Sequence, residues 1–222
     1  ASRASTTGGM QVYSIIKTED EKMKDKLQEI HFGMPMLKEA PVTLTFLADF
    51  NRFNKWCEER NAKPVYDNFM SFITASIDAI IAAQNACVAA EDQGLGICYI
   101  GTVTYQAKKL IDLFELPKGV VPVACITIGY PNEDYPQVDR LPLDAIVHNE
   151  KYHDYSGEDI DKIYEYKESL DSSKQFIEEN NKETLPQVFT EVRYPEKMNV
   201  DFSNTLLEVL EEQGFMNNSM DE

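Results

Sequence analysis

The longest hydrophobic pattern in the chain is a helix-like run that starts near residue 67 and continues to Gly94. Alanines recur around most of this run and alternate with isoleucines, so it has no wide polar face. A helix that is apolar on nearly all sides is buried in a core or an interface. Asp78 and four other polar residues interrupt the window of about 20 apolar residues that a membrane span would need. The pattern therefore predicts a buried helix rather than a transmembrane one.

A compact apolar segment, residues 95–101, follows the helix directly. We expect Gly94 to end the helix in the left-handed conformation. Gly96 and Gly101 allow close approach to the backbone on either side of Tyr99 and Ile100. Either a flat ligand or another strand could occupy that space.

The rest of the chain alternates short apolar runs with amphipathic stretches. Thr18 to Glu21 has the composition of a capping box, and the helix it would open presents Met23, Leu27 and Ile30 on one face. We predict strands over residues 11–17, 42–47, 97–104 and 120–128, and further helices over residues 53–60, 105–113 and 204–213. This order predicts an α+β, layered α/β domain.

Composition changes after Asn149, where acidic residues and tyrosines accumulate. This stretch has too few apolar residues to build its own core. We therefore predict a core domain over residues 1–148 and an excursion over residues 149–222 that wraps over the core or over a partner subunit. Its tyrosines are better suited to interface packing than to stacking on a substrate.

Charge and cysteine content narrow the class of protein. The chain has 222 residues, 43% of them hydrophobic, and a net charge of −17. That charge argues against nucleic acid or an anionic membrane as a partner. The four cysteines form no C-x-x-C pair, and at least three lie in apolar sequence, which is typical of buried free thiols in a reducing cytoplasm.

The three histidines do not have the spacing of metal ligands, so we predict no metal site. We find no signal peptide and no transmembrane segment.

Several short motifs occur in a specific order and spacing. They are Gln93-Gly94-Leu95-Gly96-Ile97-Cys98-Tyr99-Ile100-Gly101, Leu116-Pro117, Val120-Val121-Pro122-Val123, Ile128-Gly129-Tyr130-Pro131 and Arg140-Leu141-Pro142. Together they resemble the FMN-dependent nitroreductase family. Asp49-Phe50-Asn51-Arg52 and Gln213-Gly214-Phe215 resemble its NADPH-preferring nitroreductase and flavin reductase branch. The resemblance covers almost the whole chain and implies a mostly antiparallel central sheet flanked by helices, with a C-terminal excursion.

The resemblance also implies the residues of a flavin site. They are Ser5, Thr6, Thr7 and Gln11 beside the flavin ring, Tyr99, Ile100 and Gly101 with their backbone near it, and Arg140 on the phosphate. Arg193 lies near the position where relatives bind the NADPH phosphate. By themselves, residues 5–11 fit an ordinary polar loop better, and a lone arginine is usually a solvated surface residue. Residues 99–101 fit a strand packed in the core about as well as a flavin contact.

Two departures from the family pattern concern the same site. The family opens with a helix bearing an Arg-x-Ser-x-Arg motif that binds FMN, and the chain as given starts after that point, so we expect it to be truncated. Met34-Pro35-Met36 stands where relatives have glutamine and tyrosine, which makes Met34 an apolar site candidate. Val138 replaces a second basic residue near Arg140.

The resemblance implies a homodimeric FMN enzyme whose active sites lie at the dimer interface. Such an enzyme takes hydride from NADPH or NADH and passes it, by ping-pong kinetics, to a nitroaromatic, a quinone or free flavin. The cofactor supplies the reactive atom, so no catalytic side chain is expected. Two alternatives remain: a flavin-free homologue that acts as a binding or scaffold dimer, and a related enzyme that performs dehalogenation or dehydrogenation.

Overall fold

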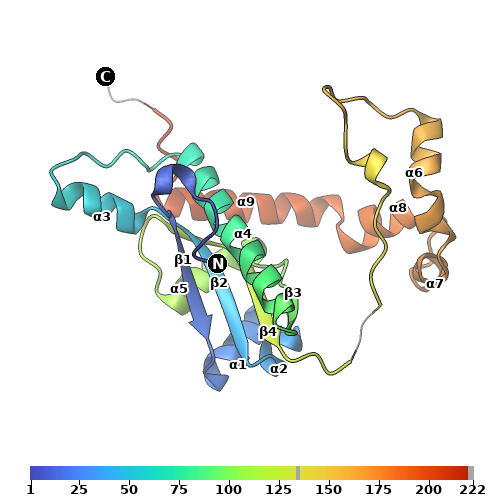
Figure 1. Cartoon of the computed structure of the whole chain (residues 1–222), viewed down its shortest axis with the longest axis horizontal. Coiled ribbons are helices and arrows are strands. Elements are labelled where there is room, and N and C mark those ends of the chain that lie inside the picture. The colour runs from blue at the N-terminus through green and yellow to red at the C-terminus, as the bar shows by residue number, and fades with distance from the viewer. Residues whose placement is uncertain (134–135, 220–222) are drawn as a thin grey trace. The chain divides into compact units, whose positions relative to one another are not determined.

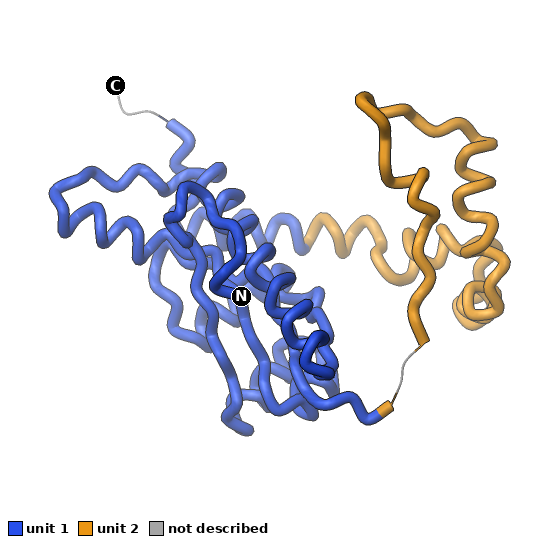
Figure 2. The backbone as a smooth tube through the Cα atoms, viewed as in Figure 1, with its two compact units in different colours: residues 1–132, 202–222 blue, residues 133–201 orange. Residues whose placement is uncertain are grey.

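The computed structural model describes residues 1–133 and 136–219, which form two compact units (Figure 2). Unit 1 consists of Ala1–Asn132 and Phe202–Glu222, and unit 2 of Glu133–Asp201. The division between residues 148 and 149 stays a prediction from composition.

A four-stranded sheet forms the centre of unit 1 (Figure 1). Its strands are β1 (Tyr13–Thr18), β2 (Val42–Asp49), β3 (Gly96–Tyr99) and β4 (Val120–Gly129), in the order β1-β2-β4-β3. Every neighbouring pair is antiparallel. The predicted α+β fold, with a mostly antiparallel sheet flanked by helices, is confirmed.

Helix α4 (Phe69–Asp92) crosses one face of this sheet. Its inner side consists largely of alanines, which let the helix approach the strands closely, and Ala75, Ala79, Ala82 and Ala83 have no exposed surface. Gly94 ends the helix with φ 74°, as predicted. The outer side keeps large apolar residues in solvent: Met70, Ile77, Ile80, Ile81 and Val88.

Length and composition alone would allow α4 to cross a membrane, the one such helix among the described residues. Only 44% of its most apolar window is buried inside the protein. Core helices of soluble proteins pass the same test, and α4 packs against β2 and β4 as such a helix does.

Three helices cover the opposite face of the sheet: α1 (Glu21–Ile30), α2 (Met36–Glu39) and α5 (Ala107–Phe114). They enclose a cluster built from Leu27, Leu37, Ile100, Val103, Leu110 and Cys125. The predicted capping box at Thr18 is wrong, because Thr18 is the last residue of β1 and pairs with Thr43. Asp20 caps α1 instead, and its carboxylate accepts the Met23 N–H at 2.9 Å.

The strand predicted over residues 97–104 is too long. β3 ends at Tyr99, and the Ile100 N–H makes one more bond, to the Cys125 carbonyl at 2.9 Å. The chain then turns into a short 3₁₀ turn (Thr104–Gln106) and α5. It curls there because Ile100, Val103 and Leu110, at helical rather than strand spacing, all enter the cluster under α1 and α2.

The C-terminal segment of unit 1 completes another hydrophobic cluster. Helix α3 (Asn51–Glu59) follows β2, and α9 (Glu196–Glu212) begins eight residues earlier than the predicted start at Asn204. Val209, Leu210 and Phe215 are fully buried against Phe50 and Phe72. The last part of the predicted excursion is therefore a part of the main core.

Unit 2 contains short helices: α6 (Gly157–Ser169), α7 (Asp171–Glu179), α8 (Leu185–Gln187) and a π-helical turn (Val188–Arg193), after a 3₁₀ turn (Leu143–Ala145). Capping boxes open α6 at Ser156 and α8 at Thr184. Lys167 and Asp139 form a half-buried ion pair at 2.8 Å. Few apolar side chains are buried here, as the composition predicts; they include Leu185 and Val188.

All four cysteines are free thiols. Cys87 and Cys125 are buried, whereas Cys57 and Cys98 are half-buried. Burial raises the pKa of the Cys125 thiol to about 12, so this sulfur stays protonated and inert.

Candidate functional site

The polar segment before β1 forms a tight turn on the α4 side of the sheet. Thr7 opens a 3₁₀ turn (Thr7–Gly9), and Thr7 N–H and Oγ–H both donate to one carboxylate oxygen of Asp78, at 2.9 and 3.1 Å. Gly8 and Gly9 are left-handed, with φ of 56° and 71°. Ser5 and Gln11 are exposed. The segment therefore presents hydroxyl and amide groups to solvent, while Asp78 of helix α4 holds its backbone in place.

Tyr99, Ile100 and Gly101 lie at the end of β3 and alternate between the two faces of the sheet. The Tyr99 ring is 42% exposed, and its hydroxyl donates to Oε1 of Gln84 on α4 at 3.4 Å. Burial and a hydrogen bond with Cys87 raise the pKa of Tyr99 to about 12. Ile100 points the other way into the core, whereas a side chain at Gly101 would meet nothing within 4 Å. The open space at Gly101 leaves room for a planar ligand against the backbone.

Met34 lies in the loop between α1 and α2 and packs against the cluster that contains Ile100. The same loop begins with His31, which is fully buried and whose Nδ1 lies 2.7 Å from Oγ1 of Thr102. Thr102 follows Gly101 directly. The structure therefore brings the Met34 loop and the Gly101 turn together, and a hydrogen bond joins them.

The two predicted phosphate-binding arginines belong to unit 2. Arg140 is exposed, and its guanidinium donates to the carbonyls of Val138 and Asp139 at 3.2 and 2.9 Å. Arg193 stacks over the ring of Phe176 at 5.0 Å. Both arginines therefore belong to a different unit from the predicted ring-binding residues.

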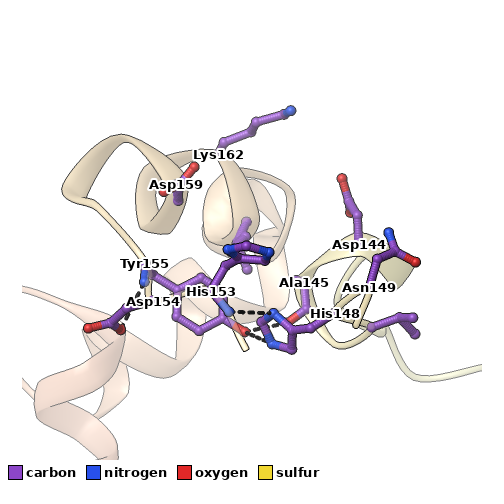
Figure 3. Close-up of a pocket in the computed structure, with 11 residues that line it drawn as sticks. Asp144, Ala145, His148, Asn149, His153, Asp154, Tyr155, Asp159 and Lys162 are labelled. Carbon is purple, nitrogen blue, oxygen red and sulfur yellow. Dashed lines mark hydrogen bonds between the residues drawn. The ribbon is translucent and has the colours of Figure 1, made fainter. Parts of the chain in front are cut away.

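A further pocket, of about 330 Å³, lies within unit 2 and contains His148 and His153 (Figure 3). The His153 N–H donates to Nδ1 of His148 at 3.3 Å, so the proton of a neutral His148 is on Nε2, which lies 3.2 Å from the Tyr155 hydroxyl. That hydroxyl donates to the Ala145 carbonyl at 2.8 Å. These polar groups bind one another, and the network fixes the fold of the segment that carries them.

Three residues that support the site were not predicted as site residues: Asp78, Arg52 and His31. Asp78 was visible in the sequence only as an interruption of an apolar helix, although a charge inside such a pattern is itself a signal of a buried polar contact. Arg52 donates to the backbone carbonyls of Gln11 and Tyr13, residues about 40 positions away in the chain. No sequence pattern indicated that His31 is buried near the site, because its burial depends on how α1 and α2 fold together.

The groups at this site are suited to binding a ligand. Hydroxyls, backbone amides and an open glycine backbone can hydrogen-bond the edge of a flat heterocycle and lie against its face. Such a donor set fits the ring of a flavin mononucleotide.

Comparison with known proteins agrees with the fold. Residues 10–130 match the model of the nitroreductase family. The FMN reductase [NAD(P)H] of Bacillus subtilis (strain 168) is 34% identical over 216 residues, which cover 96% of this chain and 84% of the relative. An NADPH-dependent oxidoreductase of Staphylococcus aureus (strain MSSA476) is 31% identical over 82% of this chain and 71% of the relative.

A solved structure is closely similar as well. A crystal structure of a Bacteroides fragilis NCTC 9343 protein assigned to the oxidoreductases superposes with a TM-score of 0.96 at 57% identity, over 97% of this chain and 87% of that one. The family match, the sequence relatives and the shared fold all identify the same group. This chain belongs to the nitroreductase family.

Proposed function

We propose that this protein is an FMN-dependent oxidoreductase that takes hydride from NADPH or NADH and reduces a second small molecule in the same site. The observation that carries the proposal is the open backbone at Gly101, beside the exposed Tyr99, on a nitroreductase fold. Relatives named FMN reductase [NAD(P)H] and NADPH-dependent oxidoreductase support the same chemistry. Bound FMN would supply the atom that accepts and donates hydride.

The residues of this chain would bind and orient the cofactor. Ser5, Thr6, Thr7 and Gln11 would bond the edge of the ring, and the backbone of Tyr99, Ile100 and Gly101 would lie against it. Met34 would add an apolar contact. Arg140 would leave its two backbone carbonyls to bind the phosphate, a stronger, charge-assisted interaction. Arg193 would meet the 2′-phosphate of NADPH.

We further propose a homodimer formed through the outer side of α4. Ile77, Ile80, Ile81 and Val88 lie along one exposed stripe of that helix, each at least 37% exposed. Exposed apolar residues that gather on one face of a helix mark an interaction surface. Residues 149–222 would contribute contacts to the partner subunit. Four free thiols suit a reducing, cytoplasmic setting.

The visible absorption spectrum of the purified chain, incubated with FMN and then desalted, tests the central proposal. We expect a protein-bound flavin band that bleaches when NADPH is added without oxygen and returns with a nitroaromatic, a quinone or free FMN. Initial rates with both substrates varied should give parallel double-reciprocal lines, as ping-pong kinetics require. If no flavin is retained under any loading condition, the proposed function is wrong and a flavin-free binding or scaffold dimer is favoured.

Arginine variants test the two phosphate assignments separately. Arg140→Gln should weaken FMN binding about tenfold or more, because it removes a charged partner of the phosphate. Arg193→Gln should raise KM for NADPH and leave KM for NADH unchanged. Arg60→Gln, at an exposed arginine whose guanidinium donates to the adjacent Glu59 carbonyl, is the matched control. Equal effects of all three variants would refute the assignments.

Dimer formation is tested by Ile80→Glu, which places a charge on the proposed interface. Light scattering should show the wild-type mass as twice the chain mass and the variant mass as that of the monomer. Lys55→Glu on the exposed α3 helix is the control and should stay dimeric. A monomeric wild type, or a dimeric Ile80→Glu variant, would exclude this interface.

A further inference from the structure

The carboxylate of Asp78 is buried in the most apolar helix of the protein. Asp78 is 1% exposed, and its helix neighbours Ala75, Ala79 and Ala82 have no exposed surface. Within residues 1–133 and 136–219, no lysine, arginine or histidine forms an ion pair with it. A buried charge without an ion pair is costly unless hydrogen bonds compensate it. Asp78 must therefore be compensated by neutral donors.

All of the donors come from one segment of the chain, the polar turn before β1. Thr7 supplies its N–H and its hydroxyl to Oδ1, at 2.9 and 3.1 Å, and Val12 supplies its N–H to Oδ2 at 3.4 Å. The two oxygens thus hold the two ends of residues 7–12. A carboxylate is suited to this role because it only accepts hydrogen bonds.

Arg52, at the start of α3, holds the same segment from another element. Its guanidinium donates to the Gln11 carbonyl in a very short contact and to the Tyr13 carbonyl at 3.4 Å. Asp49 holds the backbone of Arg52, because its Oδ1 accepts the backbone N–H of Arg52 at 3.3 Å. The other oxygen of Asp49 accepts the Ser14 hydroxyl in a very short contact.

The held backbone is unusual. Gly8, Gly9 and Gln11 all have positive φ, of 56°, 71° and 52°, within four residues. Glycine loses much conformational freedom when fixed, and a left-handed glutamine is sterically strained. Such a backbone persists only where its surroundings over-determine it. Asp78 and Arg52 supply that constraint, while Gln11 stays exposed and its N–H has no partner among the described residues.

We propose that Asp78 and Arg52 are positioning residues that pre-form the ring-binding edge of the flavin site. This inference rests on the proposed function, since residues 5–11 are the segment assigned there to the flavin ring. Neither residue needs to touch the cofactor. Their effect is to keep the segment in one conformation before FMN arrives, so that binding does not have to order it.

Asp78→Asn, which is nearly isosteric, and Arg52→Met, which keeps an unbranched stem without the guanidinium, test the proposal. The asparagine replaces one acceptor oxygen by an NH₂ group that cannot accept the Thr7 or Val12 N–H. If either variant lowers the population of the competent segment to about one tenth, the apparent Kd for FMN rises about tenfold. Ser76→Ala is the matched control, since Ser76 lies on the same helix and its hydroxyl donates to the Phe72 carbonyl within that helix, at 2.7 Å.

Three measurements separate positioning from general loss of stability. The first is the FMN Kd by fluorescence titration, well below the unfolding temperature of each variant. The second is hydrogen–deuterium exchange of a peptide spanning residues 5–13 without FMN, which should speed up in both variants and not in Ser76→Ala. The third is the double variant, whose loss of FMN affinity should be less than the product of the single losses, because both residues hold one segment.

The outcomes are distinct. If the wild type binds no FMN, the proposed function fails, and the positioning role fails with it. If the wild type binds FMN and Asp78→Asn binds it equally well, the positioning role alone is wrong. It is also wrong if Ser76→Ala weakens FMN binding as much as Asp78→Asn does, or if exchange over residues 5–13 is unchanged.

Discussion

Protonation of His31 should destabilise the folded protein. The ring has no exposed surface, Nδ1 lies 2.7 Å from the Thr102 hydroxyl, and Nε2 has no hydrogen-bond partner among the described residues. A second ring proton would place a positive charge and an unpaired N–H inside the core. Burial accordingly lowers the pKa of His31 from 6.5 to about 4.

The direction in which stability changes with pH follows from the linkage between protonation and folding. Because the folded pKa lies below the unfolded value, the unfolded chain takes up the proton first as the pH falls. The stability contributed by neutral His31 is complete above pH 6.5 and is lost progressively down to about pH 4. At about 1.4 kcal/mol for each pKa unit, the full loss is about 3 kcal/mol. About 2 kcal/mol of it falls between about pH 7.5 and about pH 5.

Urea unfolding of the wild type and of His31→Asn, measured across that pH range, isolates this effect. Asparagine keeps a polar group near Thr102 but does not titrate, so the free energy of unfolding of the variant should fall less steeply, by about 2 kcal/mol. His153→Asn, at an exposed histidine, should follow the wild type. Equal slopes for the wild type and His31→Asn would refute the reasoning.

Three further substitutions test individual contacts. Lys24→Met should cost about 1–2 kcal/mol, because the buried Nζ bonds two backbone carbonyls at the end of α2, at 3.2 and 3.1 Å. Phe215→Ala should cost about 3–5 kcal/mol, since this side chain near the C-terminus is fully buried in the core. Gly129→Ala should cost about 1–3 kcal/mol, because its Cβ would lie 2.9 Å from Cδ of Pro41. Chemical denaturation measures all three.

The Lys24 and Gly129 substitutions each have a control in the same protein. Lys17 forms an exposed ion pair with Glu19, and Lys17→Met should cost less than about 0.5 kcal/mol. Gly157→Ala, where an added Cβ meets nothing within 4 Å, should be nearly neutral. A Lys24 variant as stable as the Lys17 variant, or a Gly129 variant as stable as the Gly157 variant, would contradict the assigned contacts.

The sequence by itself determined the elements whose signals are local. The apolar run of α4 and the left-handed Gly94 after it were predicted, because helix burial and the glycine stop depend on a few neighbouring residues. The continuous apolar run of β4 and the shorter strand pattern of β2 predicted both strands. Short motifs that contain Gly94, Gly96, Gly101 and Arg140 identified the family. Their order and spacing can be read from the sequence without knowing any tertiary contact.

Only the tertiary structure decided how distant residues combine. β3 is shorter than its apolar run because Val103 is drawn into the cluster beneath α1, and Phe215 enters the core although composition assigned it to an excursion. The partners of Asp78 and Arg52 lie many residues away, so no local pattern could reveal them. Burial of His31 likewise depends on neighbouring elements. Hydrogen bonds and desolvation depend on which residues are close in space, whereas sequence patterns show only which residues are close along the chain.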